Sequence, residues 1–328
     1  MTTTGEPLAS AADVTVKELR YGVGPINTMD LYTASQSAGP ENAAPTRNVL
    51  VYVRGGAWRS GDKSEYKDLA SKLVAASPSL EVAVVNYVLS PRKPEDGPAV
   101  RHPTHAADVL RALHCLIDPS SDEALGTRSS SLPSETNLWL VGHSCGAHIL
   151  SSIFLRPPED SPSSSLTPSP ELIGSVKGIM LAEGIYDIDL LLSLHPTYGD
   201  FVEGAFTARF SYTDVSTPNF TTREGTGHIQ WIVVHSAGDS LINEEESLAM
   251  YDALVKLYSG TANVSKDFSF TEDHFEVLHT EAFHDLLLRF SGRGESKKIL
   301  SEDDLPPVAS IKEAAVAALL PNASNILS

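Results

Sequence analysis

The chain has 328 residues, 41% of them hydrophobic, which is enough for one large core, and α/β folds of this length often form a single domain. Its formal net charge is -18 at pH 7, and this argues against a nucleic-acid partner because phosphate binding needs a basic surface. The sequence has no apolar run of about 18 residues, so no membrane partner is expected. The expected partner is a small-molecule substrate, and nothing in the sequence indicates an oligomeric state.

The N-terminal residues and the cysteines indicate a compartment. The first residues lack the basic and apolar regions of a secretory signal. The only two cysteines, Cys115 and Cys145, are too few for a disulfide scaffold. We therefore expect a cytoplasmic protein.

Apolar runs and helical spacings alternate along most of the chain. Continuous apolar runs such as Asn48–Val53 are typical of strands buried on both faces. The patterns predict strands at residues 14–21, 28–33, 48–53, 80–89, 137–141, 176–182, 229–235 and 265–270. They predict helices at residues 65–76, 105–117, 145–154, 244–258 and 280–290. This alternation indicates an α/β fold with a mostly parallel central sheet and helices on both faces.

Four segments depart from this alternation. Ser120–Ser134 and Pro157–Pro170 are rich in serine and proline and are predicted to be surface loops. Residues Asp187–Gly227 show no clear strand and are predicted to form a small cap over the carboxyl edge of the sheet. Residues 1–292 are expected to be one domain and residues 293–328 a C-terminal tail. The helical patch at Ile311–Leu320 makes that tail either a docked helix or a frayed terminus.

The segment Gly142–Gly146 (GHSCG) matches the pattern G-x-S-x-G. A strand pattern precedes it and a helical pattern follows, so Ser144 is expected on a sharp strand-to-helix turn that exposes its hydroxyl group to a base. The helix N-terminus beside it favours a developing oxyanion. A glycine-rich turn with no chemistry is the structural alternative. The context favours Ser144 as a nucleophile.

A second glycine-rich segment, Arg54–Trp58 (RGGAW), follows the strand at residues 48–53. Esterases and lipases of the α/β-hydrolase fold place an oxyanion loop at this point of the chain, and its backbone N–H groups face the reacting carbonyl oxygen. We expect Gly55, Gly56 and the N–H group of Cys145 to form the oxyanion hole. An ordinary Gly-Gly turn is the alternative.

The acid and the base of a catalytic triad should follow the serine in that order in this fold. Asp239 lies in the loop after the predicted strand at residues 229–235, and its alternative role is the N-cap of the next helix. His274 lies after the last predicted strand and is the expected base. His279 and His284 fall at or within the last helix, where a structural role fits better.

Several histidines are also candidate metal ligands. His102 with His105, or His274 with His279 and His284, could in principle be ligands, but neither set has the H-E-x-x-H pattern or the cysteine pairing of a strong zinc site. We therefore expect neither a metal nor a cofactor.

Taken together, the motifs resemble those of the fungal kynurenine formamidases (arylformamidases). The resemblance covers residues 13–292 and rests on five segments, which are Arg54–Trp58 (family pattern HGGxW), His102–Asp108 (HPxHxxD), Gly142–His148 (GHSxGAH), Glu183–Asp187 (EGIYD) and Asp273–Val277 (DHxEV). It implies a serine hydrolase of tryptophan breakdown that converts N-formyl-L-kynurenine to L-kynurenine and formate through an acyl-enzyme.

The resemblance also implies roles for individual residues. Ser144 would attack the formyl carbonyl, His274 would take and return the proton, and Asp239 would hold the imidazole tautomer. Trp58 and Tyr186 are candidates for lining the substrate pocket. Arg54 stands where the family has histidine, and we expect it either to pair with an acidic neighbour such as Asp62 or Glu65 or to attract a substrate carboxylate.

Three functions are compatible with these motifs. The first is a formamidase. The second is an esterase or amidase of secondary metabolism that shares the mechanism and acts on a different acyl substrate. The third is a hydrolase fold without catalysis that serves as a binding protein, and the presence of Ser144, Asp239 and His274 argues against it.

Overall fold

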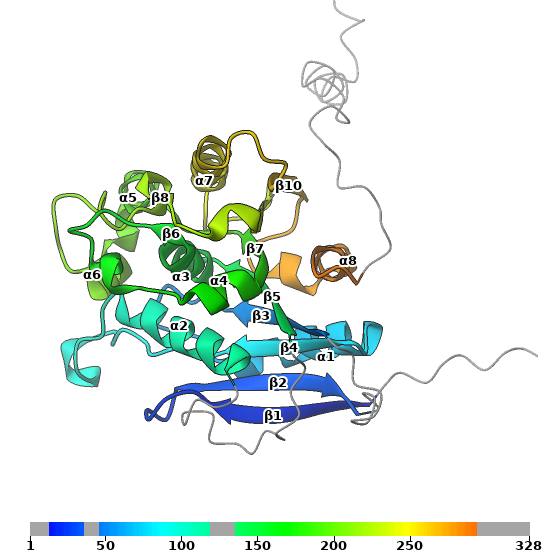
Figure 1. Cartoon of the computed structure of the whole chain (residues 1–328). Helices are drawn as coiled ribbons and strands as arrows, with labels where there is room; N and C mark the ends of the chain where they lie inside the picture. Colours follow the sequence, from blue (N-terminus) through cyan, green and yellow to red (C-terminus); the bar gives the residue numbers. More distant parts are fainter. Residues whose placement is uncertain (1–12, 36–45, 119–134, 294–328) are drawn as a thin grey trace, which may run out of the picture. The chain divides into compact units, whose positions relative to one another are not determined.

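The computed structural model describes residues 13–35, 46–118 and 135–293. Its centre is an eight-stranded sheet with the strand order β1-β2-β4-β3-β5-β7-β9-β10 (Figure 1). The strands are β1 (Val14–Arg20), β2 (Thr28–Ala34), β3 (Thr46–Val53), β4 (Leu80–Val85), β5 (Glu135–His143), β7 (Val176–Ala182), β9 (Gln230–Ser236) and β10 (Val264–Phe270).

One strand runs against the others. β2 pairs antiparallel with both of its neighbours, β1 and β4. Every neighbouring pair from β4 to β10 is parallel. The carboxyl ends of β3, β5, β7, β9 and β10 therefore meet at one edge, as the prediction of a mostly parallel sheet requires. The fold class is confirmed.

Helices cover both faces of the sheet. One face packs against α1 (Lys67–Ala76) and α8 (Glu281–Phe290). The other packs against α2 (Thr104–Ile117), α3 (Cys145–Phe154), α4 (Pro170–Ser175) and α7 (Glu244–Leu257). Because successive strand residues point to opposite faces, Val49, Val51 and Val53 belong to the second face, and Leu50 and Tyr52 to the first.

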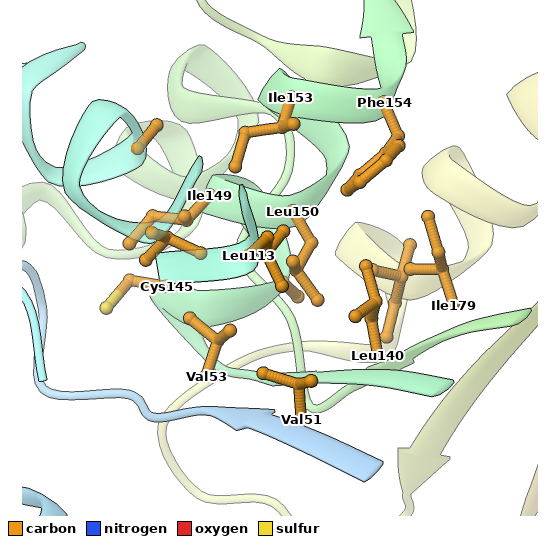
Figure 2. Close-up of a cluster of buried hydrophobic side chains, with 14 of the residues drawn as sticks. Val51, Val53, Leu113, Leu140, Cys145, Ile149, Leu150, Ile153, Phe154 and Ile179 are labelled. Carbon is orange, nitrogen blue, oxygen red and sulfur yellow. The ribbon is translucent and has the colours of Figure 1, made fainter. Parts of the chain in front are cut away.

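The second face holds a dense apolar cluster below α3 (Figure 2). Leu140 of β5 and Ile179 of β7 lie on the side of the sheet that faces α3, with Leu150 of α3 next to Leu140, and all three side chains are fully buried. This packing fixes the N-terminus of α3 against the carboxyl end of β5, which is the position of Ser144.

Residues between β7 and β9 form the region expected as a cap. They comprise α5 (Ile188–Leu194), α6 (Gly199–Phe206) and three short 3-10 turns, of which Pro196–Tyr198 joins the two helices. The expectation of no strand here needs a small correction, because β8 (Thr221–Thr222) pairs with β6 (Leu155–Arg156). No helix among the described residues is long and apolar enough to cross a bilayer.

Two predictions from the sequence differ from the structure, one on the end of a strand and one on a loop. The strand predicted at residues 80–89 ends at Val85, which forms the last residue pair with β3. The loop at Pro157–Pro170 is less exposed than expected, because Ser163 is buried and its hydroxyl group lies 2.7 Å from His102 Nε2. The segment 120–134 and the helical patch at 311–320 lie outside the described residues, and the domain division near residue 292 stays a prediction.

Candidate active site

Ser144 occupies the turn between β5 and α3 and has φ 54° and ψ -124°. A positive φ is unfavourable for a residue with a side chain, so the surroundings must hold it. Ser144 N donates to Ala182 O at 2.9 Å, and Ile185 N donates to Ser144 O at 3.3 Å. The last residue of β7 and the loop that follows it thus hold both sides of the turn.

The glycines around Ser144 are required by close approach. A Cβ atom on Gly146 would lie 2.2 Å from Val53 O, and one on Gly142 would lie 2.6 Å from Gly146 O. Only glycine lets α3 begin this close to the end of β3. Cys145 is the first residue of α3, so its N–H group is one of those without a partner inside the helix.

His274 and Asp239 meet as the sequence led us to expect. His274 Nδ1 donates to Asp239 Oδ2 at 2.7 Å, and both side chains are buried. Asp239 Oδ1 accepts from Leu241 N at 2.8 Å and from Ile242 N at 2.9 Å. Burial alone would raise the pKa of Asp239, but the hydrogen bond from His274 and these backbone donors outweigh it and lower the pKa. Asp239 is therefore a carboxylate.

His143, which precedes the candidate nucleophile, also positions His274. Its Nε2 donates to the carbonyl oxygen of His274 at 3.0 Å, and the two rings lie 4.6 Å apart. Burial lowers the pKa of His143 to about 3, so this ring is neutral at physiological pH.

Glu183, at the end of β7, is a further buried carboxyl group at the site. Its side chain is fully buried, and its backbone has φ 48°. Glu183, Asp239 and His274 offer ligand atoms within 4.8 Å of one another, and among the described residues this is the one group of His, Cys, Asp and Glu side chains compact enough to hold a metal ion. The earlier histidine sets do not form such a group among those residues. The sequence interpretation missed Glu183, although a carboxylate directly after a buried strand is the signal that identified Asp239.

The loop after β3 passes beside Ser144. A Cβ atom on Gly55 would lie 2.9 Å from Ser144 Cβ, and Gly56 has φ 113°. Arg59 N, Ser60 N and Ser60 Oγ all donate to Gly56 O, which closes the loop into a tight turn. Gly55 therefore lies against Ser144, and Gly56 lines the same pocket. That the N–H groups of Gly55, Gly56 and Cys145 form an oxyanion hole stays a prediction.

Of the two roles expected for Arg54, attraction of a substrate carboxylate is not supported, because Arg54 does not line the pocket described below. Its side chain is fully buried, and its Nη1 donates to Ser60 O at 2.6 Å and to Gly55 O at 3.1 Å. Its Nε donates to Asn86 Oδ1 at 3.2 Å, and Asn86 in turn donates to Asp62. Arg54 therefore fixes the glycine loop from below and reaches the acidic neighbour through Asn86.

Ser144 and His274 line one pocket with a volume of about 250 Å³. Its other lining residues are mainly aromatic and aliphatic and come from the glycine loop, the cap and the loops after β9 and β10, namely Gly56, Ala57, Arg59, Ile185, Tyr198, Phe201, Leu241, Ile242 and Phe275. Arg59 is the cation in this lining. Its Nη1 pairs with Asp200 of α6, and its guanidinium carbon lies 5.5 Å from the centre of the Phe201 ring.

Trp58 and Tyr186, the two aromatic residues predicted to line the pocket, lie outside this lining. Trp58 is fully buried and packs against Phe201, with ring centroids 6.2 Å apart. Tyr186 is also fully buried, and its backbone N–H group donates to Glu246 Oε2 at 2.7 Å. The Trp58 side chain thus packs behind Phe201, a residue of the pocket lining. Tyr198, Phe201 and Phe275 provide its aromatic surface. Tyr198 and Phe201 lie in no motif, and Phe275 occupies the variable position of the Asp273–Val277 segment.

Comparison with known proteins identifies the fold family of the chain. A model of the α/β-hydrolase fold matches residues 50–225. The kynurenine formamidase of Meyerozyma guilliermondii is 28% identical over 249 residues, which cover 73% of this chain and 80% of that protein. The kynurenine formamidase of Eremothecium gossypii is 28% identical over 254 residues, which cover 72% and 92%.

The fold is shared with solved esterases. An inhibited esterase B from Lactobacillus rhamnosis superposes with a TM-score of 0.59 and 15% sequence identity, covering 96% of this chain and 92% of that one. The family model spans more than half of the chain, and both of these relatives are kynurenine formamidases. This chain is therefore a hydrolase resembling the kynurenine formamidases, and it belongs to the α/β-hydrolase fold family.

Proposed function

We propose that the protein is a serine hydrolase that cleaves an aryl formamide such as N-formyl-L-kynurenine, releasing formate and the aryl amine L-kynurenine. The observation that carries this proposal is the arrangement of Ser144 on a left-handed turn, in one pocket with a His274 whose Nδ1 is hydrogen-bonded to Asp239. Relatives named kynurenine formamidase supply the substrate class.

The mechanism follows from these positions. Ser144 Oγ attacks the formyl carbon while His274 Nε2 takes its proton, and the Asp239 carboxylate stabilises the imidazolium that forms. The oxyanion is stabilised by backbone N–H groups of the glycine loop and of Cys145 at the start of α3. His274 then returns the proton to the aryl nitrogen, and the C–N bond breaks.

Water completes the reaction. It attacks the formyl-enzyme with His274 as the base, the ester bond to Ser144 Oγ breaks, and formate leaves as Ser144 regains its proton. Among the described residues, no hydrogen bond joins the Ser144 hydroxyl group to His274. Such contacts often tighten only when substrate binds, so this geometry is compatible with the role.

The pocket lining suits the substrate. Tyr198, Phe201 and Phe275 offer an apolar surface for an aromatic ring, and Arg59 offers a charge for the carboxylate group of an amino acid. The volume of about 250 Å³ favours a small acyl group beside one ring.

A substrate panel tests the proposal. N-formyl-L-kynurenine and short p-nitrophenyl esters are assayed with wild type and with Ser144→Ala, and a fluorophosphonate adduct is sought by mass spectrometry. We expect hydrolysis of the formamide by wild type, and labelling of Ser144 that the variant abolishes. If the esters are hydrolysed and the formamide is not, the protein acts on a different acyl substrate. Equal labelling of wild type and Ser144→Ala would refute Ser144 as the nucleophile.

A further inference from the structure

Glu183 is held in an unfavourable conformation by its neighbours. Its φ of 48° lies in the left-handed region, which costs a residue other than glycine about 1 kcal/mol or more. Glu183 N donates to Val234 O at 3.0 Å, so the residue extends the contact between β7 and β9. The surrounding structure therefore places this side chain inside the fold, beside Asp239.

The polar contacts of Glu183 are unequal. Its Oε2 accepts from Ser236 N at 3.2 Å and lies 3.3 Å from His235 Nδ1. Its Oε1 is buried and finds no donor among the described residues. A buried carboxylate oxygen without a donor is unfavourable, whereas an oxygen that carries a proton needs an acceptor instead. The neighbouring acceptor is the carboxylate of Asp239.

The charges around Glu183 also favour the protonated form. The titratable groups that face it are Asp239, His235, His274 and Tyr186. Burial lowers the pKa of His235, so this ring provides no positive charge at neutral pH. Burial, followed by the nearby carboxyl group of Asp239, raises the pKa of Glu183 well above its usual range.

Two adjacent buried carboxyl groups cannot both be ionised without a large penalty. Asp239 takes the negative charge because it accepts from His274 Nδ1 and from two backbone N–H groups. Glu183 accepts from one backbone N–H group. The proton shared by the pair therefore belongs on Glu183.

We propose that Glu183 is a positioning residue of the triad, whose protonated carboxyl group donates a hydrogen bond to Asp239 and fixes that carboxylate against His274. The inference rests on the proposed serine-hydrolase function. The proposal adds a fourth residue to the triad. Glu183 would contact Asp239, Asp239 contacts His274, and His274 would act on Ser144.

The direction of the pH effect follows from the sign of the shift. Because the folded protein holds the Glu183 proton more tightly than the unfolded chain does, the contact persists above the ordinary glutamate pKa and is lost only as pH rises through the raised value. Loss of the proton puts a second negative charge beside Asp239. We therefore expect the reactivity of Ser144 to fall at alkaline pH.

The test measures the rate at which a fluorophosphonate inactivates the full-length protein as a function of pH, because this rate depends on the triad and not on the natural substrate. Glu183→Gln keeps a donor for Asp239 and an acceptor for Ser236 N, so it should react nearly as fast as wild type and lose the alkaline fall. Glu183→Leu removes the donor and should react about ten- to a hundredfold more slowly.

Glu246→Gln is the matched control. Glu246 is buried on α7, where burial raises its pKa to about 8, but it accepts from the backbone N–H groups of Tyr186 and Asp187 rather than facing the triad. This variant should keep the wild-type alkaline fall.

The outcomes separate the two proposals. A wild type that is not labelled at Ser144 refutes the proposed function. A labelled wild type together with a Glu183→Leu protein that reacts equally fast refutes the role of Glu183. If Glu183→Leu does not fold, Glu183→Gln still decides, because an unchanged alkaline fall in that variant contradicts the inference.

Discussion

The interior of the sheet and its carboxyl edge are built on different principles. In the interior, alternate residues of β3, β5 and β7 point to one face or the other, and nearly all of these side chains are apolar. At the edge, the chain leaves ordinary backbone geometry. Five non-glycine residues of the described chain have positive φ, and four of them, Ala57, Trp58, Ser144 and Glu183, follow β3, β5 or β7.

The difference shows what each region contributes. Apolar burial in the interior stabilises the fold, at roughly 25 cal/mol for each Å² of apolar surface removed from water. The edge residues cost stability, about 1–3 kcal/mol for each unfavourable backbone conformation. The interior therefore holds the edge in a geometry that the edge sequences would not adopt alone, and that geometry creates the site.

The largest expected effect is a loss of kcat on replacing a residue at the carboxyl edge of the sheet. His274→Ala should lower kcat about a thousandfold or more, because the base and its hydrogen bond to Asp239 are both lost. His279→Ala is the matched control, since His279 is exposed on the same segment and should retain wild-type kcat. The reverse result would assign the base to His279. Steady-state kinetics and thermal melts of both variants decide.

The next effect concerns the contact between the two regions. Gly146→Ala would bring a Cβ atom within 2.2 Å of Val53 O, a backbone atom that cannot move aside, and should destabilise the protein by about 3 kcal/mol or more with loss of activity. Gly174→Ala, in α4, adds a Cβ atom with no neighbour within 4 Å and should cost no stability. Urea unfolding compares the two, and equal stabilities would refute the close approach.

A change in the interior should affect stability and leave chemistry intact. Leu140→Ala removes a fully buried side chain from the cluster below α3 and should reduce the free energy of unfolding by about 2–5 kcal/mol. Because Leu140 does not line the pocket, kcat measured well below the melting temperature should stay near the wild-type value. A large loss of kcat in a folded variant would show that packing in the interior also determines the geometry of the active-site residues.

The same division explains what the sequence could predict. Helix α3 and strand β7 were predicted with the observed bounds, because hydrophobic periodicity defines the interior. Asp239 and His274 were expected to meet, because the order of the triad residues in this fold is known and both follow strands of a parallel sheet.

The rest depended on contacts that no local pattern contains. Arg54 and Arg59 are five residues apart on one loop, yet Arg54 points into the fold and Arg59 lines the pocket. Successive left-handed residues at Gly56, Ala57 and Trp58 reverse the chain between them. The role of Glu183 likewise depends on the meeting of β7 with the loop after β9.

The smallest expected effect tests which cation of that loop faces the substrate. Arg59 already pairs with Asp200, whose side chain is 72% exposed, and the remaining guanidinium donors can hold a substrate carboxylate. Arg59→Gln should therefore raise KM for N-formyl-L-kynurenine about tenfold and leave KM for neutral p-nitrophenyl esters nearly unchanged. Asp200→Asn should act in the opposite direction, because it removes the anion that competes with the substrate for Arg59. If Arg59→Gln raises KM equally for both substrates, the residue shapes the pocket through its contact with Phe201 instead, and the carboxylate is recognised elsewhere.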